Sequence, residues 1–243
     1  MLGGVGAALS VGFLGDAIAA PDGQILVRVW ASDRAAERDG LEPRVRGYLH
    51  AALDPVVEVV GVQFSERTVS LPAETGREVL SQRWPRIVAE GAAGLRELDP
   101  IAGVNLLVTD GDPRTRPAGF ARPQVAATTG AKQLAAMPPA DEAPAVVRYS
   151  VRAAATQLLL HECGHALGLS HDHGSANAAN DAVVASPMVS SYLWKSEKRR
   201  TAALDGPTNA CGEGYPPPDA EGERFLRMRY ADCARRALRS MHE

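Results

Sequence analysis

The chain has little of several features by which protein classes are recognised. Its 243 residues include only three cysteines, and none of them sits in a CxxC pair, which argues against a disulfide scaffold, a thiolate zinc site and a thioredoxin-like redox site. Charge of one sign is also scarce, because 26 basic and 29 acidic side chains leave a net charge of −3. We therefore expect no nucleic-acid partner. Beyond residue 20 no segment approaches the ~18 consecutive apolar residues of a membrane helix, so we expect no membrane span.

Aromatic residues are few as well. The sequence has 4 Phe, 3 Trp and 5 Tyr, so the core must be built mainly from Ala, Val and Leu. The hydrophobic share of 45% and the charged share of 23% are nevertheless those of a globular protein. The length fits one large domain or two small ones. We expect a folded protein that is a monomer.

Residues 1–20 are apolar and rich in glycine, and their single charge is Asp16. The small residues that precede Pro21 resemble the end of a secretory signal peptide. Against this interpretation, no Lys or Arg precedes the apolar stretch, and five glycines interrupt it. Two interpretations stay open, a cleaved signal peptide and an N-terminal arm. The first of them predicts a secreted protein.

From residue 24 onward, predicted strands alternate with predicted helices. Strands are predicted at 24–30, 56–64 and 103–109, and helices at 43–53 and 78–98, from β-branched runs, helical periodicity and the prolines that bound them. The third strand is nearly continuous in apolar residues, which is typical of a strand buried on both faces. This order predicts an α/β (α+β) fold with a mixed sheet.

The second half of the chain has a different pattern. Prolines divide residues 110–145 into loops, with short strand-like pieces at 119–121 and 124–129, and prolines that flank a strand favour a sheet edge. Residues 145–167 are apolar on nearly all sides, which is typical of a buried helix. After a polar, loop-rich stretch, an amphipathic helix is predicted at 221–240, and we interpret its arginines as a solvated face.

The end of the predicted buried helix holds a group of histidines. His161 and His165 are followed by Gly168 and His171. Two histidines four residues apart on a helix lie about 40° apart around its axis and ~6 Å apart along it, so both imidazoles can reach one metal ion. A glycine three residues later can adopt a positive φ and turn the chain, so that His171 returns as a third ligand. Cys163 points to the far face and is expected to be a small buried apolar residue.

Three neutral imidazoles with an open fourth position are typical of a catalytic zinc site. Glu162 lies beside the metal rather than on it, so it can accept a proton from a zinc-activated water and pass it to a leaving amine. A closed structural site would need a fourth protein ligand, for which Asp172 and His173 are the nearby candidates. We expect both of them to have structural roles in the loop rather than to bind the metal. The pattern predicts hydrolysis of amide bonds.

The motif resembles the HExxHxxGxxH signature of the metzincin clan of zinc endopeptidases. The residues that match it are His161, Glu162, His165, Gly168 and His171. The clan carries a methionine in a tight turn beneath the metal, and the resemblance implies this Met-turn role for Met188. It also implies an upper subdomain with a twisted mixed sheet and two long helices at 21–168, and a small irregular lower subdomain with a C-terminal helix at 169–243. An extended substrate peptide would pair with an edge strand, for which 119–129 is the candidate.

The family within the clan stays open. Some members have a tyrosine two positions after the Met-turn methionine that assists the transition state, whereas here Tyr192 lies four positions after it and is the candidate helper. Cys211 and Cys233 could form a disulfide in an oxidising compartment or remain two thiols. The polar segment 172–181 could hold calcium, although its spacing is not that of an EF-hand. Zinc is the one cofactor that the motif supports.

The sequence thus predicts a secreted zinc-dependent endopeptidase whose substrate is a protein or peptide. Two alternatives stay open. One is a zinc-binding recognition or adhesion module of metzincin fold without general proteolytic activity, against which the intact Glu162 argues. The other is a peptidase of narrow specificity.

Overall fold

The computed structural model describes residues 24–54, 59–71, 79–114, 118–179, 182–189 and 223–242. The segment 1–20, Tyr192 and Cys211 lie outside them. The signal peptide, the secretion that it implies and the helper role of Tyr192 therefore stay predictions.

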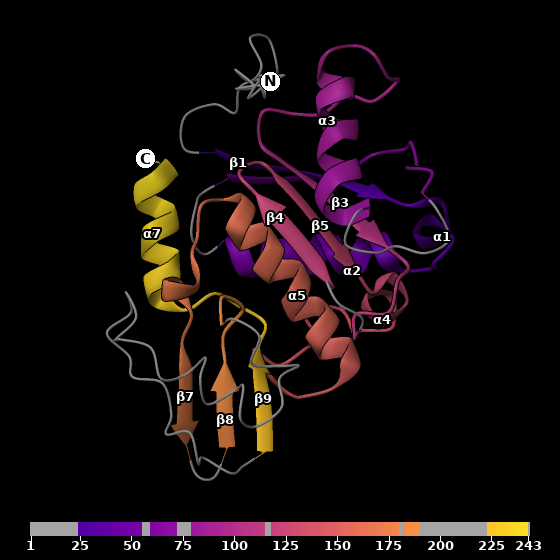
Figure 1. Ribbon diagram of the computed structural model, residues 1–243. Helices are drawn as coiled ribbons and strands as arrows, with labels where there is room; N and C mark the ends of the chain where they lie inside the picture. The colour runs from indigo at the N-terminus through magenta and orange to yellow at the C-terminus, as the bar shows by residue number, and fades with distance from the viewer. Residues whose placement is uncertain are drawn as a thin grey trace, which may run out of the picture.

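Five strands form the first sheet, in the order β2-β1-β3-β5-β4 (Figure 1). They are β1 (Gln24–Ala31), β2 (Val59–Phe64), β3 (Val104–Thr109), β4 (Gly119–Arg122) and β5 (Val125–Thr129). The strands run parallel except for β4, which is antiparallel to β5 and lies at the edge. All six residues of β3 are buried, as expected for a central strand covered on both faces. The candidate edge segment 119–129 is thus two strands, and only the first of them is an edge.

Helices cover both faces of this sheet. They are α1 (Asp33–Ala36), α2 (Leu41–Leu53), the π-helical turn η1 (Val79–Arg83), α3 (Trp84–Ala92), α4 (Ala131–Ala135) and α5 (Val151–Ala166). On one face, Val27 and Leu106 belong to a core shared with α2 and α5. On the other face, Trp30 meets Trp84 of α3 edge to face, with ring centroids 6.1 Å apart. The sheet is therefore the middle of three layers.

The helix predicted at 78–98 is shorter and divided. Pro85 occupies the first turn of α3, where a missing amide donor costs least. The helix ends at Ala92, and Gly94 then adopts a positive φ of 69°, a conformation that glycine reaches without steric cost. The glycines near the end of the predicted helix thus mark its stop.

Helix α5 runs between the first sheet and a second one (Figure 1). The prediction of a helix at 145–167 was wrong at its start, because the β-branched residues before it form strand β6 (Val146–Arg148). Ser150 caps the helix, since its hydroxyl accepts a hydrogen bond from the Ala153 amide at 3.1 Å. One side of α5 packs in the core of the first sheet and another side packs in the core of the second. This explains why its sequence is apolar on nearly all sides.

The second sheet has four strands in the order β6-β9-β8-β7. Besides β6, its strands are β7 (Ala176–Ala179), β8 (Ala182–Ala185) and β9 (Glu223–Arg227). The short 3-10 helix η2 (His171–His173) precedes β7, and the closing helix α7 (Asp232–His242) follows β9. The helix predicted at 221–240 was therefore wrong in its first part. Leu226 and Met228 are buried on either side of the more exposed Arg227, which is the two-residue period of a strand. A regular sheet thus replaces much of the irregular lower part that was expected.

These two mixed sheets and their helices confirm the predicted α+β class. Strand β6 precedes α5 and yet pairs with β9, so the second sheet takes strands from both sides of Gly168. The division into 21–168 and 169–243 stays a prediction. Of the helices described, none has the length and apolar character needed to cross a membrane.

Candidate metal centre

The last turns of α5 carry two of the three predicted histidine ligands. His161 and His165 lie on the same side of the helix, with their Nε2 atoms 3.1 Å apart. Their rings are nearly perpendicular, at 88°, with centroids 4.6 Å apart. This is the proximity that a four-residue spacing on a 3.6-residue repeat dictates.

The chain reverses directly after this helix. Gly168 has the positive φ that its position predicted, at 100°. Its amide donates to the His165 carbonyl at 3.0 Å, and the Leu169 amide donates to the Gly164 carbonyl at 2.9 Å. These two bonds form a Schellman motif, which satisfies the last carbonyls of the helix. The turn brings His171, the first residue of η2, back toward the helix.

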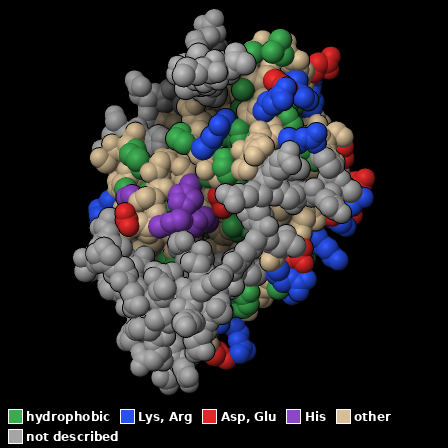
Figure 2. Space-filling model, viewed as in Figure 1, with side chains coloured by type: hydrophobic (Ala, Val, Ile, Leu, Met, Phe, Trp, Pro, Cys, Tyr) green, Lys and Arg blue, Asp and Glu red, His purple; other side chains and the backbone are tan. Residues whose placement is uncertain are grey.

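The three imidazoles converge on one point. The Nε2 atoms of His165 and His171 are 3.0 Å apart, and one nitrogen from each of the three rings lies within 4.8 Å of the others. His171 is exposed, whereas His161 and His165 are half-buried. The group therefore opens to solvent on the His171 side, and Figure 2 shows histidine side chains gathered on the surface.

Backbone carbonyls orient two of these rings. The Nδ1 atom of His161 lies 2.6 Å from the Pro187 carbonyl oxygen, and that of His165 lies 2.7 Å from the Leu169 carbonyl oxygen. A carbonyl oxygen can only accept, so each Nδ1 carries a proton and donates it. Burial, and secondly the neighbouring His165, lower the pKa of His161 to about 3, so this imidazole is neutral at pH 7. Its Nε2 atom then presents a lone pair to the group.

This arrangement fits a metal ion. Lone pairs that face one another at 3.0 to 3.1 Å repel unless a cation lies between them. A tetrahedral ion with metal–nitrogen bonds of about 2.0–2.1 Å would hold its ligand nitrogens roughly 3.3 Å apart, close to the spacing observed. The three histidines could therefore hold a metal ion, and all-imidazole donors suit zinc, copper, iron or nickel.

Glu162 follows the first histidine and is buried, with 8% of its surface exposed. Desolvation raises the pKa of its carboxyl to about 8. The side chain packs against the backbone of strand β4. A Cβ built on Gly119 would lie 2.6 Å from Cγ and 2.7 Å from Cδ of Glu162. The carboxyl group thus lies against the edge strand of the first sheet.

Met188 packs against α5 between the two helical histidines. It is fully buried, in a tight turn closed by a hydrogen bond of 3.2 Å from the Val189 amide to the Ser186 carbonyl. The Sδ atom would lie 2.5 Å from a Cβ built on Gly164, so a larger residue at that position would displace the methionine side chain. Because Pro187 in the same turn orients the first histidine, the turn contacts the site in two ways.

Tyr230 supports the same part of α5 from the chain segment after β9. Its hydroxyl donates to the Leu160 carbonyl at 2.6 Å, and its Cε1 atom would lie 3.1 Å from a Cβ at Gly164. The motif did not predict the contacts of Tyr230, Gly119 or the two orienting carbonyls. Only the Leu169 carbonyl lies at a short fixed distance from the histidines, four residues after His165, whereas the others come from distant segments of the chain.

The two alternative ligands lie outside the histidine group. His173 Nδ1 accepts a hydrogen bond of 3.1 Å from the Ser170 amide, and Asp172 is exposed. Neither joins a group of three metal-ligating side chains among the residues that the structure describes. These positions agree with the loop roles expected for both.

The cysteines occupy different environments. Cys163 is a free thiol, fully buried on the far side of the helix, as expected. Cys233 lies in the first turn of α7, but Cys211 is outside the described residues, so their pairing stays a prediction. The calcium hypothesis for 172–181 includes two undescribed residues and also stays untested.

Strand β4 offers backbone groups at the open edge of the sheet. The Thr129 amide donates to the Ala118 carbonyl at 2.9 Å, and Gly119 lies opposite Thr128. Since bonded and non-bonded pairs alternate in an antiparallel ladder, the amides and carbonyls of Gly119 and Ala121 point away from β5. Among the described strands, none covers this side of β4.

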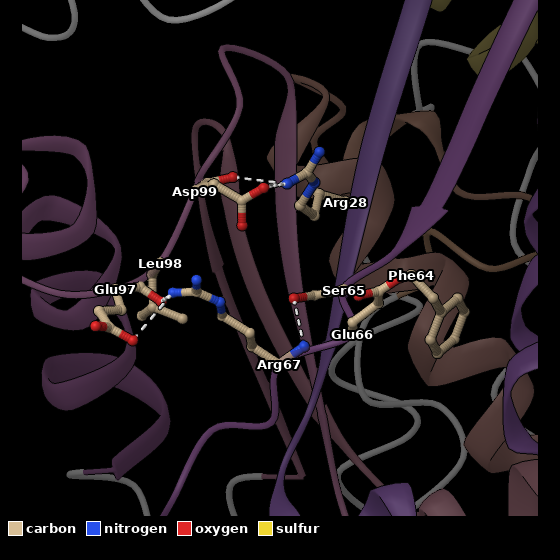
Figure 3. A pocket seen from close by; sticks show the side chains of 8 residues that line it. All are labelled: Arg28, Phe64, Ser65, Glu66, Arg67, Glu97, Leu98 and Asp99. Atoms are coloured by element: carbon tan, nitrogen blue, oxygen red, sulfur yellow. Dashed lines mark hydrogen bonds and ion pairs between the residues drawn. The ribbon is translucent and has the colours of Figure 1, made fainter.

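A separate hollow of about 430 Å³ lies beside the end of β2 and shares no residue with the histidine group (Figure 3). Arg28 binds the carboxylate of Asp99 and also its carbonyl oxygen, the latter at 2.9 Å. Arg67 pairs with Glu97 at 3.6 Å. The positive charges of the wall are thus already balanced by acidic side chains.

No protein-family model matches this chain, and a search of curated proteins gives no match. The likeness to the metzincin clan is limited to the spacing of the three histidines and the residues around them.

Proposed function

We propose that this chain is a zinc-dependent endopeptidase of the metzincin type. The observation that carries the proposal is the convergence of three imidazole Nε2 atoms within 4.8 Å, directly beside the buried Glu162. Three protein ligands leave a fourth coordination position for water or substrate, as catalytic zinc sites require. The solvent-exposed side of the group, at His171, supplies the access that a substrate needs.

The residues of the chain have separate roles in this mechanism. His161, His165 and His171 would hold the ion, and the Pro187 and Leu169 carbonyls set the tautomers of the first two. Zinc, when bound, polarises the substrate carbonyl and lowers the pKa of water to about 7.

Glu162 moves the proton. The charge of a zinc ion beside it would favour the ionised form of this carboxyl group, against the desolvation that raises its pKa. The carboxylate would accept a proton from the attacking water and return it to the leaving amine nitrogen, so that one side chain acts first as base and then as acid. The protons of the hydrolysis therefore balance without a second titratable group. Packing of Glu162 against β4 keeps most of its surface away from bulk water.

The substrate proposed for this site is an extended peptide. The outward amides and carbonyls of Gly119 and Ala121 can pair with such a peptide as an added strand, which supplies affinity through backbone hydrogen bonds. Glu162 packs on the same strand. A peptide in this position would run past the proposed base.

The test combines zinc stoichiometry with cleavage of an unbiased peptide library. Wild type should bind one zinc ion per chain and cleave peptides. Glu162→Gln should keep the zinc and lose roughly 10²–10⁴-fold in kcat/KM, the usual contribution of a general acid or base. The matched control is Glu142→Gln, which changes an exposed glutamate in the loop before β6 and should leave both quantities unchanged.

Two results would reject parts of the proposal. If monodisperse wild type binds zinc and cleaves no peptide, a recognition or adhesion module replaces the enzyme. If Glu162→Gln cleaves as fast as wild type, the proposed role of this carboxylate is wrong.

A further inference from the structure

The contact between Glu162 and strand β4 has a consequence for position 119. We propose that Gly119 is a positioning residue, whose missing side chain sets where the Glu162 carboxylate lies. The catalytic part of this inference rests on the proposed function. The steric part concerns only the folded chain and can be tested without activity.

The geometry leaves no room for a side chain at this position. A Cβ on Gly119 would clash with Oε1 of Glu162 and would lie 2.6 Å from its Cγ and 2.7 Å from its Cδ, whereas ordinary contacts are 3.4–4 Å. Three atoms of one side chain would be displaced together. Alanine at position 119 and the observed place of the carboxylate are therefore incompatible.

Backbone conformation does not explain why the position is glycine. The described glycines with positive φ are Gly40, Gly94, Gly130 and Gly168, and Gly119 is not among them. Glycine inside a strand costs stability because it gains nothing from packing and loses more entropy. The β4–β5 register runs without a bulge from Gly119 to Arg122. Close approach of another group also favours glycine in a strand, and the group here is the carboxyl of Glu162.

The same residue serves the open edge of the sheet. The backbone amide and carbonyl of Gly119 point away from β5, and the strand is fixed by pairing with β5. Gly119 thus positions two groups at once. Its backbone can pair with a bound peptide, and its Cα atom contacts the Glu162 carboxyl group. This is how the first sheet would hold the base in register with the bound peptide.

A double-mutant cycle on the metal-free protein tests the contact. Gly119→Ala should lower the thermal midpoint Tm by roughly 2–10 °C, the range expected for an overpacked site in a chain of this size. In a Glu162→Ala background the same substitution should lower Tm by less than half as much. The matched control is Gly111→Ala, whose Cβ would meet Thr129 Cγ2 at 3.1 Å. Its effect on Tm should be equal in both backgrounds.

Kinetics test the positioning role. Gly119→Ala should still bind one zinc ion per chain, with affinity within a few-fold of wild type, because no histidine contact changes. Its kcat should fall about 10–100-fold, since a displacement on the order of 1 Å can cost this much, while KM stays within about twofold. Gly111→Ala should retain wild-type kcat.

Each outcome decides the inference. Equal Tm shifts for Gly119→Ala in both backgrounds, or an unchanged kcat, would overturn it. If Gly119→Ala does not fold, folding of the double variant with Glu162→Ala supports the contact, and failure of both variants overturns it. If wild type cleaves no peptide, the proposed function fails, and the thermal cycle still tests the contact by itself.

Discussion

Gly164 lies in α5 between the two helical histidines, and its replacement by alanine tests the packing beneath the site. A Cβ at this position would lie 2.5 Å from Met188 Sδ, 3.1 Å from Tyr230 Cε1 and 3.3 Å from Leu169 Cδ1. Tyr230 is held by the hydrogen bond from its hydroxyl to the helix, and Met188 is fully buried. The new methyl group therefore meets neighbours that have little room to retreat.

Two opposing effects set the magnitude. In an unobstructed helix interior, alanine is more stable than glycine by about 0.8–1 kcal/mol. Overpacking a core costs about 1–3 kcal/mol, and the three simultaneous contacts favour the upper part of that range. The net expectation is a loss of about 1–2 kcal/mol, or roughly 2–8 °C in Tm for a chain of this length.

Displacement of the turn that contains Pro187 and Met188 should also disturb the metal site. Pro187, next to Met188, accepts the Nδ1 proton of His161. Loss of such an orienting bond typically weakens metal binding 10–100-fold. We expect a zinc Kd about tenfold weaker for Gly164→Ala.

The assay is urea and thermal unfolding of the metal-free protein, followed by zinc titration against a chelator. Gly47→Ala in α2 is the matched control, because its Cβ would meet only Ala140, with the nearest atom at 3.3 Å. This control should be unchanged or slightly more stable and should bind zinc normally. Gly164→Ala that is as stable as Gly47→Ala, with unaltered zinc affinity, would refute the proposed packing.

Other substitutions test single contacts. His171→Ala should weaken zinc binding roughly 100-fold or more in chelator competition. The zinc affinity of the control variant Asp172→Ala should stay within a few-fold of wild type. Equal affinities of the two variants would show that His171 is not a ligand. Met188→Ala should cost about 2–5 kcal/mol in urea unfolding, as for other large buried side chains, and a smaller loss would mean that the site repacks. Tyr230→Phe should cost about 0.5–1.5 kcal/mol, because it removes the 2.6 Å bond to the Leu160 carbonyl; unchanged stability would contradict that bond.

Several parts of the fold follow from local patterns. Strand β3 and helix α2 lie close to their predicted bounds because apolar runs, helical periodicity and flanking prolines act within a few residues. The same locality explains the errors. The segment 145–150 reads as part of an apolar helix until its pairing with β9 is known. Residues 223–227 alternate weakly, and only the second sheet makes them a strand.

Parts of the candidate site were likewise predictable from local sequence, and other parts were not. The proximity of His161 and His165 follows from helical spacing, and Gly168 could be recognised as the turn that returns His171 to them. The partners of these residues could not be recognised in this way. The Pro187 carbonyl is 26 residues from His161 along the chain, and nothing in the sequence around Gly119 indicates contact with Glu162.

The sequence by itself therefore determined which chemical groups are available here. They are three histidines and a glutamate, which helical spacing and a glycine turn bring together. The chain has too few cysteines and too little net charge for the competing classes of site. Only the tertiary structure decided how those groups are held. Helical geometry fixes neighbours within one or two turns, whereas the carbonyl that orients a ring, the methionine that fills the space beneath it and the strand that receives the carboxylate come from distant segments. Their positions depend on which faces the two sheets turn toward α5, and local periodicity does not specify this.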